Sequence, residues 1–424
     1  MVKTKSVFTQ AYHYLCGLVQ SDKANIEKMV EAVPDSEWES IQHFISNSPW
    51  DHRGLVDQLS RDANEQVGGT PDSFFLVDES AFSKKGRSSV GVARQWNGRL
   101  GKVDNCQVGV FGALGCQDKV TLTDMRLFLP KEWTDDKDRC KKAGVPEEAM
   151  KYQSKIDLAL DIIENAQVNK LGFAWVGADS FYGRDSYFRR SLANKELVYM
   201  VDIPKDTTIY LEDPKPSVPP RKSKKGPAPK RLRASVDGFK LEKWVEDQPQ
   251  EAFTKLTIRE GTKGAMKARV LHRIIWLWDG ESEEAEKVHL VVSIKGKKSR
   301  KIKYSVSNAA DDTTRERLAY VQAQRYWVER ALQNGKSEVG MADYQVRGWR
   351  AWHHHMAIVM MAMLFMLMTK TKHQEQYKLL SASDIRILLE EFLPKRKTSK
   401  EEVIRQMEER HRKRQKDIDL NRKT

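Results

Sequence analysis

The sequence predicts an α/β protein in which a mixed β-sheet with flanking helices is joined to a helical N-terminal domain and an inserted β-rich subdomain. Three features of the 424-residue chain predict this class. Residues 1–70 carry apolar side chains at helical spacing, whereas short apolar runs typical of strands begin at Ser73. From Glu147 helical and strand-like segments alternate, and a second strand-rich stretch lies within residues 202–305.

The first 70 residues are expected to form a helical DNA-binding domain. Asp35 and Asp51 are suited to cap helices, and apolar residues follow at helical spacing. Two helices here, one within Trp38–Trp50 and one within Asp51–Leu59, could form a helix-turn-helix that reads DNA. A plain helical bundle fits the same pattern, and the sequence leaves both alternatives open.

Residues 71–201 are expected to form the first part of the sheet. Three strand-like runs joined by short connections come first, and helix, strand, helix and strand follow. This is the ribonuclease H-like order, in which the first and fourth strands lie side by side. The predicted segments are strands at 73–77, 106–113 and 120–129, a helix at 147–167, a strand at 173–178, a helix at 184–195 and a strand at 197–201.

Residues 202–305 are expected to interrupt this core with a basic arm and a β-rich insertion. Between Lys215 and Arg233 the chain has eight Lys or Arg residues and no acid. Such a stretch is typical of a solvated linker, but it could equally lie on DNA, which makes Lys222, Lys224 and Lys225 candidate phosphate contacts. Runs rich in β-branched and aromatic residues follow at 255–259, 268–278 and 288–294.

The composition favours a polyanionic partner. The formal net charge is +14, and neutralising phosphates releases counterions, although an acidic protein or an anionic membrane would also suit this charge. The four cysteines have no zinc-site spacing and indicate free thiols in a reducing compartment. The N-terminus lacks a secretion signal, and the apolar run Met356–Met368 is too short for a bilayer, so a buried core helix and no membrane are expected.

Three acidic residues occupy positions suited to divalent-metal chemistry. Asp78 follows the first apolar strand, Asp179 follows the fourth, and Glu329 lies in an amphipathic helix. Mg²⁺ binds oxygen ligands, and two ions about 4 Å apart can activate a nucleophile and stabilise a leaving oxygen. The three carboxylates therefore predict a site for two Mg²⁺ ions, which Mn²⁺ can replace, and phosphodiester cleavage.

Glu329 is expected near the last turn of a helix that is capped within Asp311–Thr314 and runs to Gln333, where Asn334 and Gly335 end it. Arg325 lies one turn before Glu329 on the same face, and Lys336 follows just past the helix end. An acid beside a cation is either a structural ion pair or a metal ligand next to a phosphate clamp, and the two upstream aspartates favour the second interpretation. This helix is assigned to a second part of the core, residues 306–372.

Other signals are weaker. Lys84 and Lys85 follow the first strand in a basic, turn-like loop that suits phosphate contact but is also ordinary loop composition. The run His353–His355 has no cysteine or second histidine pair nearby, so it is expected to cap the core helix or touch phosphate rather than bind metal. Residues 373–424 are expected to form a helical basic C-terminal region.

Several motifs in order along the chain resemble those of the DDE transposases of bacterial insertion sequences. The resemblance covers most of residues 36–368, and so long an ordered set is specific. The matching segments are Val77–Gln95 (VDESAFSKKGRSSVGVARQ), Gly101–Phe111 (GKVDNCQVGVF), Leu129–Trp133 (LPKEW), Ala143–Pro146 (AGVP), Ala178–Gly183 (ADSFYG) and Asp343–Trp349 (DYQVRGW).

The resemblance implies a cut-and-paste enzyme whose ribonuclease H-like core carries a β-stranded insertion between the second Asp and the Glu. It assigns catalysis and metal binding to Asp78, Asp179 and Glu329. Related transposases also carry a Tyr, Arg, Glu and Lys signature, of which Arg325, Glu329 and Lys336 match the last three. The Tyr is expected seven residues before the Glu, where this chain has Gln322, with Tyr320 and Tyr326 nearby.

The sequence therefore predicts a DNA transposase that binds terminal inverted repeats, cuts the strands and joins the free 3′ hydroxyls to target DNA. The resemblance implies a homodimer in the synaptic complex, at work on the nucleoid in a bacterial cytoplasm. The alternatives are a catalytically inactive or domesticated transposase-derived DNA-binding protein, against which the three acids argue, and a structure-specific nuclease.

Overall fold

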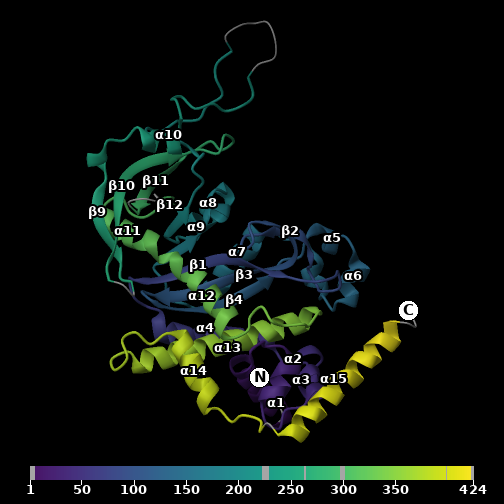
Figure 1. Ribbon diagram of the computed structural model, residues 1–424. Helices are drawn as coiled ribbons and strands as arrows, with labels where there is room; N and C mark the ends of the chain where they lie inside the picture. The colour runs from purple at the N-terminus through teal and green to yellow at the C-terminus, as the bar shows by residue number, and fades with distance from the viewer. Residues whose placement is uncertain (1–4, 222–228, 262–263, 297–300, 398, 422–424) are drawn as a thin grey trace.

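The computed structural model describes residues 5–221, 229–261, 264–296, 301–397 and 399–421 (Figure 1). Within these residues one ten-stranded sheet has the order β2-β3-β1-β5-β6-β12-β11-β10-β9, and β4 pairs with β3 beside this path. Its strands are β1 (Ser73–Ser83), β2 (Ala93–Asn97), β3 (Lys102–Cys116), β4 (Lys119–Leu127), β5 (Trp175–Ala178), β6 (Tyr199–Asp202), β9 (Thr254–Arg259), β10 (Met266–Leu277), β11 (Glu286–Lys295) and β12 (Lys301–Ser307).

The first part of the sheet confirms the predicted ribonuclease H-like order. Strand β3 pairs antiparallel with both β1 and β4, whereas β5 is parallel to β1 and β6 is parallel to β5. The sequence of neighbours is therefore β4-β3-β1-β5-β6, which places the first and fourth predicted strands side by side. The short strand β2, which the sequence pattern missed, forms a hairpin with the start of β3.

The inserted strands extend this sheet. Strand β12, which was not predicted, pairs antiparallel with β6, and β11, β10 and β9 follow in order (Figure 1). A small two-stranded sheet, β7 (Thr208–Ile209) with β8 (Phe239–Lys240), lies beside β10. The described ends of the predicted basic arm approach each other through a bridge between Ser217 and Arg233. The centre of the arm, 222–228, lies outside the described residues.

Helices cover both faces of the sheet, and two glycines of β3 allow them to approach closely. A Cβ on Gly112 would lie 2.6 Å from Ile162 of α7 (Lys155–Val168), and one on Gly109 would lie 3.1 Å from Trp352 of α13 (Trp349–His373). Helix α4 (His52–Val67) contacts β4 and α13, and α12 (Tyr326–Glu338) contacts β1. The core is thus a sheet between α7 on one side and α12 and α13 on the other.

Helix α13 confirms the predicted core helix. Among the described residues it is the one helix long and apolar enough to cross a membrane, yet 83% of its apolar window is buried in the protein. The three histidines at its start are buried and bonded inside the protein, His355 to the Tyr14 hydroxyl at 2.8 Å and His354 to the Ile45 carbonyl at 3.0 Å. Burial lowers their pKa values. His354 and His355 join α13 to the N-terminal helices, and their burial argues against the alternative of phosphate contact.

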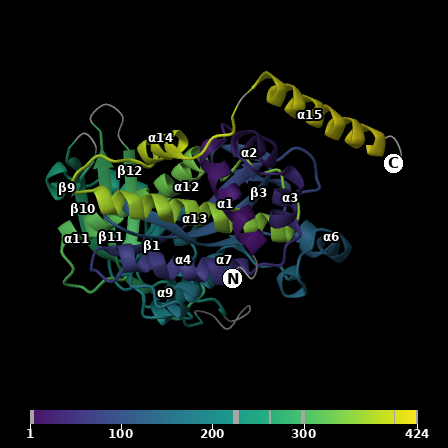
Figure 2. The ribbon, with the colours of Figure 1, turned by 90° about the horizontal axis from the view of Figure 1, so that it is seen from below.

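The N-terminal helices pack on α13, and the last helix stands away from the body. Helices α1 and α3 contact α13, whereas α4 lies along β4 as part of the core. Figure 2 shows α15 extending beyond α2 and α3. The remaining helices are α1 (Lys5–Gln20), α2 (Ile26–Ala32), α3 (Trp38–Ser46), α5 (Lys131–Thr134), α6 (Lys137–Lys142), α8 (Ser180–Gly183), α9 (Ser186–Asn194), α10 (Leu241–Glu246), α11 (Arg315–Gln324), α14 (Ala382–Phe392) and α15 (Lys400–Asn421), with short 3-10 turns at Glu147–Met150 and Gln250–Ala252.

Candidate active site

Asp78 and Asp179 lie on neighbouring strands. The parallel pairing of β1 with β5 aligns Val77 with Ala178, so the next residue on each strand is one of the two aspartates. Asp78 was expected to end its strand, but β1 continues to Ser83 and Asp78 lies in its middle. The change arises because β1 stays paired with β3 beyond the buried apolar run.

Asp179 ends the short strand β5 and begins α8. Its carboxylate accepts hydrogen bonds from the backbone N–H groups of Phe181 at 2.9 Å and Tyr182 at 3.4 Å. An Asp at the position before a helix commonly satisfies these free N–H groups. The cap fixes the Asp179 carboxylate at the edge of the sheet, where the sequence placed it.

Electrostatics couple the two aspartates. Burial and, after it, the nearby charge of Asp179 raise the pKa of Asp78 to about 7 against the opposing effect of Arg325. Burial also raises the pKa of Asp179, which the Phe181 N–H and Arg325 partly oppose. Two carboxyls held together in a buried setting disfavour double ionisation unless a cation accompanies them. The pair is therefore a site at which an added cation would be stabilised.

The helix that carries the third acid differs from its prediction. The predicted single helix is divided into α11 and α12 at Arg325, whose backbone nevertheless remains right-handed helical at φ −54° and ψ −27°. Helix α12 then continues past Gly335 to Glu338, since this glycine packs under Met341 and Met363 instead of ending the helix. Glu329 consequently lies in the first turn of α12 and Lys336 in its last turn.

Arg325 joins several carboxylates. Its Nε lies 2.7 Å from Oδ2 of Asp202, its Nη1 lies 3.8 Å from Oδ2 of Asp78, and its Nη2 pairs with Glu329. Only 18% of the Arg325 side chain is exposed, against 51% for Glu329. These acids raise the pKa of Arg325, so the guanidinium stays charged. The structure thus contains the ion pair that the sequence offered as one alternative, and phosphate binding by Arg325 stays a prediction.

The other predicted DNA contacts differ in their surroundings. Lys336 is half-buried, its Nζ lies 5.4 Å from the centre of the Phe82 ring, and burial lowers its pKa to about 8. Lys84 donates to the Tyr344 carbonyl at 3.0 Å and lies over the Tyr344 ring, whereas Lys85 is exposed. Lys222, Lys224 and Lys225 lie outside the described residues.

Two polar residues beside the site were missed by the sequence analysis. Asp202 ends β6 and binds both Arg325 and Lys303, whose Nζ lies 3.2 Å from Oδ2 of Asp202. Asp202 follows an apolar strand just as Asp179 does, so the same signal could have found it. Lys303 belongs to β12, the strand that was not predicted.

The donors at this site suit a hard divalent cation in part. In the described ranges, no three His, Cys, Asp or Glu side chains are grouped closely enough to hold a metal ion. Asp78 and Asp179 nevertheless supply two neighbouring carboxylates whose charge is underneutralised, the donor chemistry that Mg²⁺ or Mn²⁺ prefers. Glu329 is linked to Asp78 by Arg325, which forms an ion pair with each of them.

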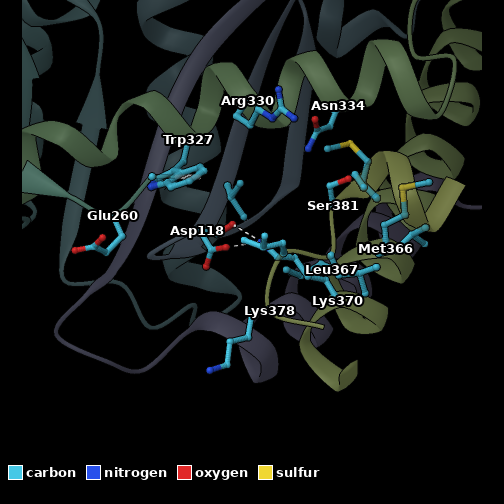
Figure 3. A pocket seen from close by; sticks show the side chains of 17 residues that line it. Asp118, Glu260, Trp327, Arg330, Asn334, Met366, Leu367, Lys370, Lys378 and Ser381 are labelled. Carbon is cyan, nitrogen blue, oxygen red and sulfur yellow. Dashed lines mark hydrogen bonds and ion pairs between the residues drawn. The ribbon is translucent and has the colours of Figure 1, made fainter. Parts of the chain in front are cut away.

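A separate cavity of about 410 Å³ lies on another side of α12 (Figure 3). It is lined by Trp327, Arg330 and Asn334 of α12 and by residues of α13 and α14, including Met366 and Ile385. None of the three predicted catalytic acids lines it. The cavity is therefore distinct from the aspartate pair.

Comparison with known proteins identifies the family. The family model described as DDE superfamily endonuclease matches residues 3–265, which include both Asp78 and Asp179. The chain belongs to the DDE superfamily endonucleases. This match confirms the family expected from the motifs.

A curated relative and a solved structure add to this comparison. The probable transposase for insertion sequence element IS701 of Microchaete diplosiphon is 25% identical over 342 residues, which cover 80% of this chain and 77% of the relative. The chain is thereby similar to an insertion-sequence transposase over most of both lengths. The NurA nuclease of Sulfolobus solfataricus is 9% identical with a TM-score of 0.25, covering 77% of this chain and 94% of that one.

Proposed function

We propose that this DDE endonuclease is the transposase of an insertion sequence, which binds terminal inverted repeats, cleaves the DNA strands and joins the 3′ hydroxyls to target DNA. The family match and the similarity to a probable transposase support the class of enzyme. The net charge of +14 supports a DNA partner, because basic proteins gain affinity by displacing counterions from phosphates. Work on DNA would place the protein with the bacterial nucleoid.

The observation that carries this proposal is the pair of Asp78 and Asp179, which are partly buried on neighbouring strands. Two coupled carboxylates at one sheet edge would bind a divalent cation, and with Glu329 they would bind two Mg²⁺ ions, which Mn²⁺ could replace. Such ions supply Lewis acidity for displacement at phosphorus. Glu329 is half exposed, so it is positioned to complete the set once Arg325 interacts with DNA.

The cations around the acids would orient the substrate. Arg325 has planar donors that match the geometry of a phosphate, and its contact with Glu329 places these donors beside the acids. Lys336 lies on the same helix, and Asp78 is one of the charges that acts on it. Lys85, exposed after β1, would bind the backbone further out.

The assembly on DNA is also part of the proposal. Residues 1–70 would contribute DNA binding, the core segments 71–201 and 306–372 would carry the acids, and the insertion 202–305 and the C-terminal region 373–424 would add further contacts. Two DNA ends must be held together for joining, so a homodimer is expected in the synaptic complex.

Joining of element ends is the test of this function. The DNA flanking the gene would be searched for matching inverted repeats, and a short duplex ending in one repeat would be incubated with a target plasmid and Mg²⁺. Joined product supports the transposase. Cleavage without joining would indicate a structure-specific nuclease, and specific binding without cleavage would indicate a transposase-derived DNA-binding protein; either result would overturn the proposal.

A further inference from the structure

Asp202 lies at the centre of a polar network behind the acids. Its Oδ1 accepts a hydrogen bond from the Ser305 hydroxyl at 2.5 Å, while its Oδ2 faces Lys303 at 3.2 Å and Arg325 at 2.7 Å. Both oxygens are thus occupied, and only 13% of the side chain is exposed. The contact with Arg325 is an ion pair without a hydrogen bond, because the Nε of Arg325 has no hydrogen-bond partner within the described residues. The Ser305 hydrogen bond and the two cations nevertheless hold this largely buried carboxylate in position, since another rotamer would leave these charges unpaired.

The partners of Asp202 are themselves held. Lys303 also donates to the Gln322 carbonyl at 3.2 Å, and the Gln322 side chain donates to the Ser305 hydroxyl and the Val291 carbonyl, each at 2.9 Å. Strands β6, β11 and β12 and helix α11 therefore meet in one connected set of hydrogen bonds. Gln322, the residue that replaces the Tyr of related transposases, is buried within it.

Arg325 is attracted by several acids. Asp202, Glu329 and the pair of Asp78 and Asp179 all attract its guanidinium. The guanidinium sits 2.7 Å from Asp202 but 3.8 Å from Asp78. Without Asp202, the acids left to pair with Arg325 would be Glu329 and Asp78. The guanidinium would then be drawn closer to Asp78, where a divalent cation would have to compete with it.

We infer that Asp202 is a positioning residue, which anchors Arg325 beside the aspartate pair and so keeps Asp78 and Asp179 open to a divalent cation. This inference rests on the proposed function, in which that pair binds the cation. It assigns to β6 a fourth carboxylate that touches no substrate and acts through Arg325. The insertion also gains a role, because β12 supplies the Lys303 and Ser305 that hold the anchor.

The test measures Mn²⁺ affinity of the DNA-free protein by electron paramagnetic resonance. Asp202→Asn is expected to weaken Mn²⁺ binding about tenfold, because Arg325 moves onto the pair. Asp202→Glu keeps the charge and should bind Mn²⁺ within about threefold of wild type. In Asp202→Asn/Arg325→Gln, affinity should return to that of Arg325→Gln alone, since no guanidinium remains to compete. If Asp202 had only a structural role, the effect of Asp202→Asn on Mn²⁺ affinity would not depend on whether Arg325 is present.

A second variant guards against misfolding of Asp202→Asn. Asp202→Asn/Lys303→Gln replaces the ion pair by a neutral pair of similar shape, and it should show the same tenfold loss, about 1.4 kcal/mol. Unchanged Mn²⁺ affinity in either folded Asp202 variant, or a loss that Arg325→Gln does not relieve, overturns the inference. If neither wild type nor Asp78→Asn binds Mn²⁺, the proposed metal site at Asp78 and Asp179 is wrong. The inference about Asp202 is then overturned as well.

Discussion

Replacing Asp78 by Asn tests the electrostatics of the aspartate pair in the protein without DNA or metal. Burial and Asp179 raise the pKa of Asp78 from 3.8 to about 7. The folded protein therefore binds a proton at Asp78 more tightly than the unfolded chain does. The resulting stability is fully present below the unfolded pKa and is lost as the pH rises through the folded pKa. Asp78→Asn does not lose this stability, because asparagine stays neutral at every pH.

The expected size follows from the two pKa values. Each unit of difference between the folded and unfolded pKa values of Asp78 changes the unfolding free energy by about 1.4 kcal/mol. Roughly two of these units lie between about pH 5 and about pH 8. The unfolding free energy of Asp78→Asn minus that of wild type should therefore rise by about 3 kcal/mol between these pH values. Taking the difference cancels the titration of groups that do not interact with Asp78.

Urea unfolding at the two pH values, with chelator present, measures this difference. The exposed Asp237 provides a matched control, and Asp237→Asn should show no such trend. Adding Mn²⁺ at the higher pH should stabilise wild type and leave Asp78→Asn unaffected, since binding to the folded state alone raises its stability. A stability difference between Asp78→Asn and wild type that stays constant with pH would refute the reasoning.

Three further predictions follow from the same contacts. Arg325→Ala should lower the unfolding free energy by about 3 kcal/mol, because it leaves Asp78 without this cation and Asp202 with Lys303 alone; an unchanged urea midpoint would show that these ion pairs are not formed in solution. Neutralising the eight cations of Lys215–Arg233 should weaken binding to specific and random duplexes alike and reduce the salt dependence, and identical binding curves would make the segment a linker. Gly112→Ala should cost about 1–3 kcal/mol, since its Cβ would meet Ile162 at 2.6 Å, and a thermal melt equal to wild type would contradict that packing.

The order of the core strands was predictable because their apolar runs are short and are separated by clear turns. A strand with both faces buried, such as β1, shows this as a continuous run of apolar residues up to Val77. What the run cannot show is where pairing stops. Strand β1 continues through Asp78 and Glu79, two polar residues whose backbone is satisfied by β3.

The inserted strands were predictable as strands but not in their placement. Strand β12 was missed because Lys301 and Lys303 interrupt its apolar pattern, and its pairing with β6 joins segments that are about a hundred residues apart. Local pattern carries no information on such long-range pairing. The role of Asp202 was hidden for the same reason, since its partners Lys303 and Ser305 lie on that strand.

The boundaries of the Glu329 helix were set by tertiary packing. Gly335 was expected to end the helix, as glycine often does, but it is buried against Met341 and Met363, where a side chain would not fit easily. Packing therefore overrode the local signal and brought Lys336 into the helix. Asp179 was correctly placed at the end of a strand and Glu329 within a helix, whereas the position of Asp78 inside its strand and the Arg325 contacts needed the folded structure.

Strand cleavage by Asp179→Asn tests the central claim most directly. A duplex carrying the terminal inverted repeat would be incubated with Mg²⁺ and wild type, Asp179→Asn or Asp237→Asn, with binding measured in parallel in Ca²⁺. The account predicts that all three proteins bind the duplex with affinities within about threefold, that wild type and Asp237→Asn cleave it, and that Asp179→Asn cleaves at least about a thousandfold more slowly. Cleavage by Asp179→Asn at a rate near that of wild type would contradict the assignment of the aspartate pair as the catalytic centre.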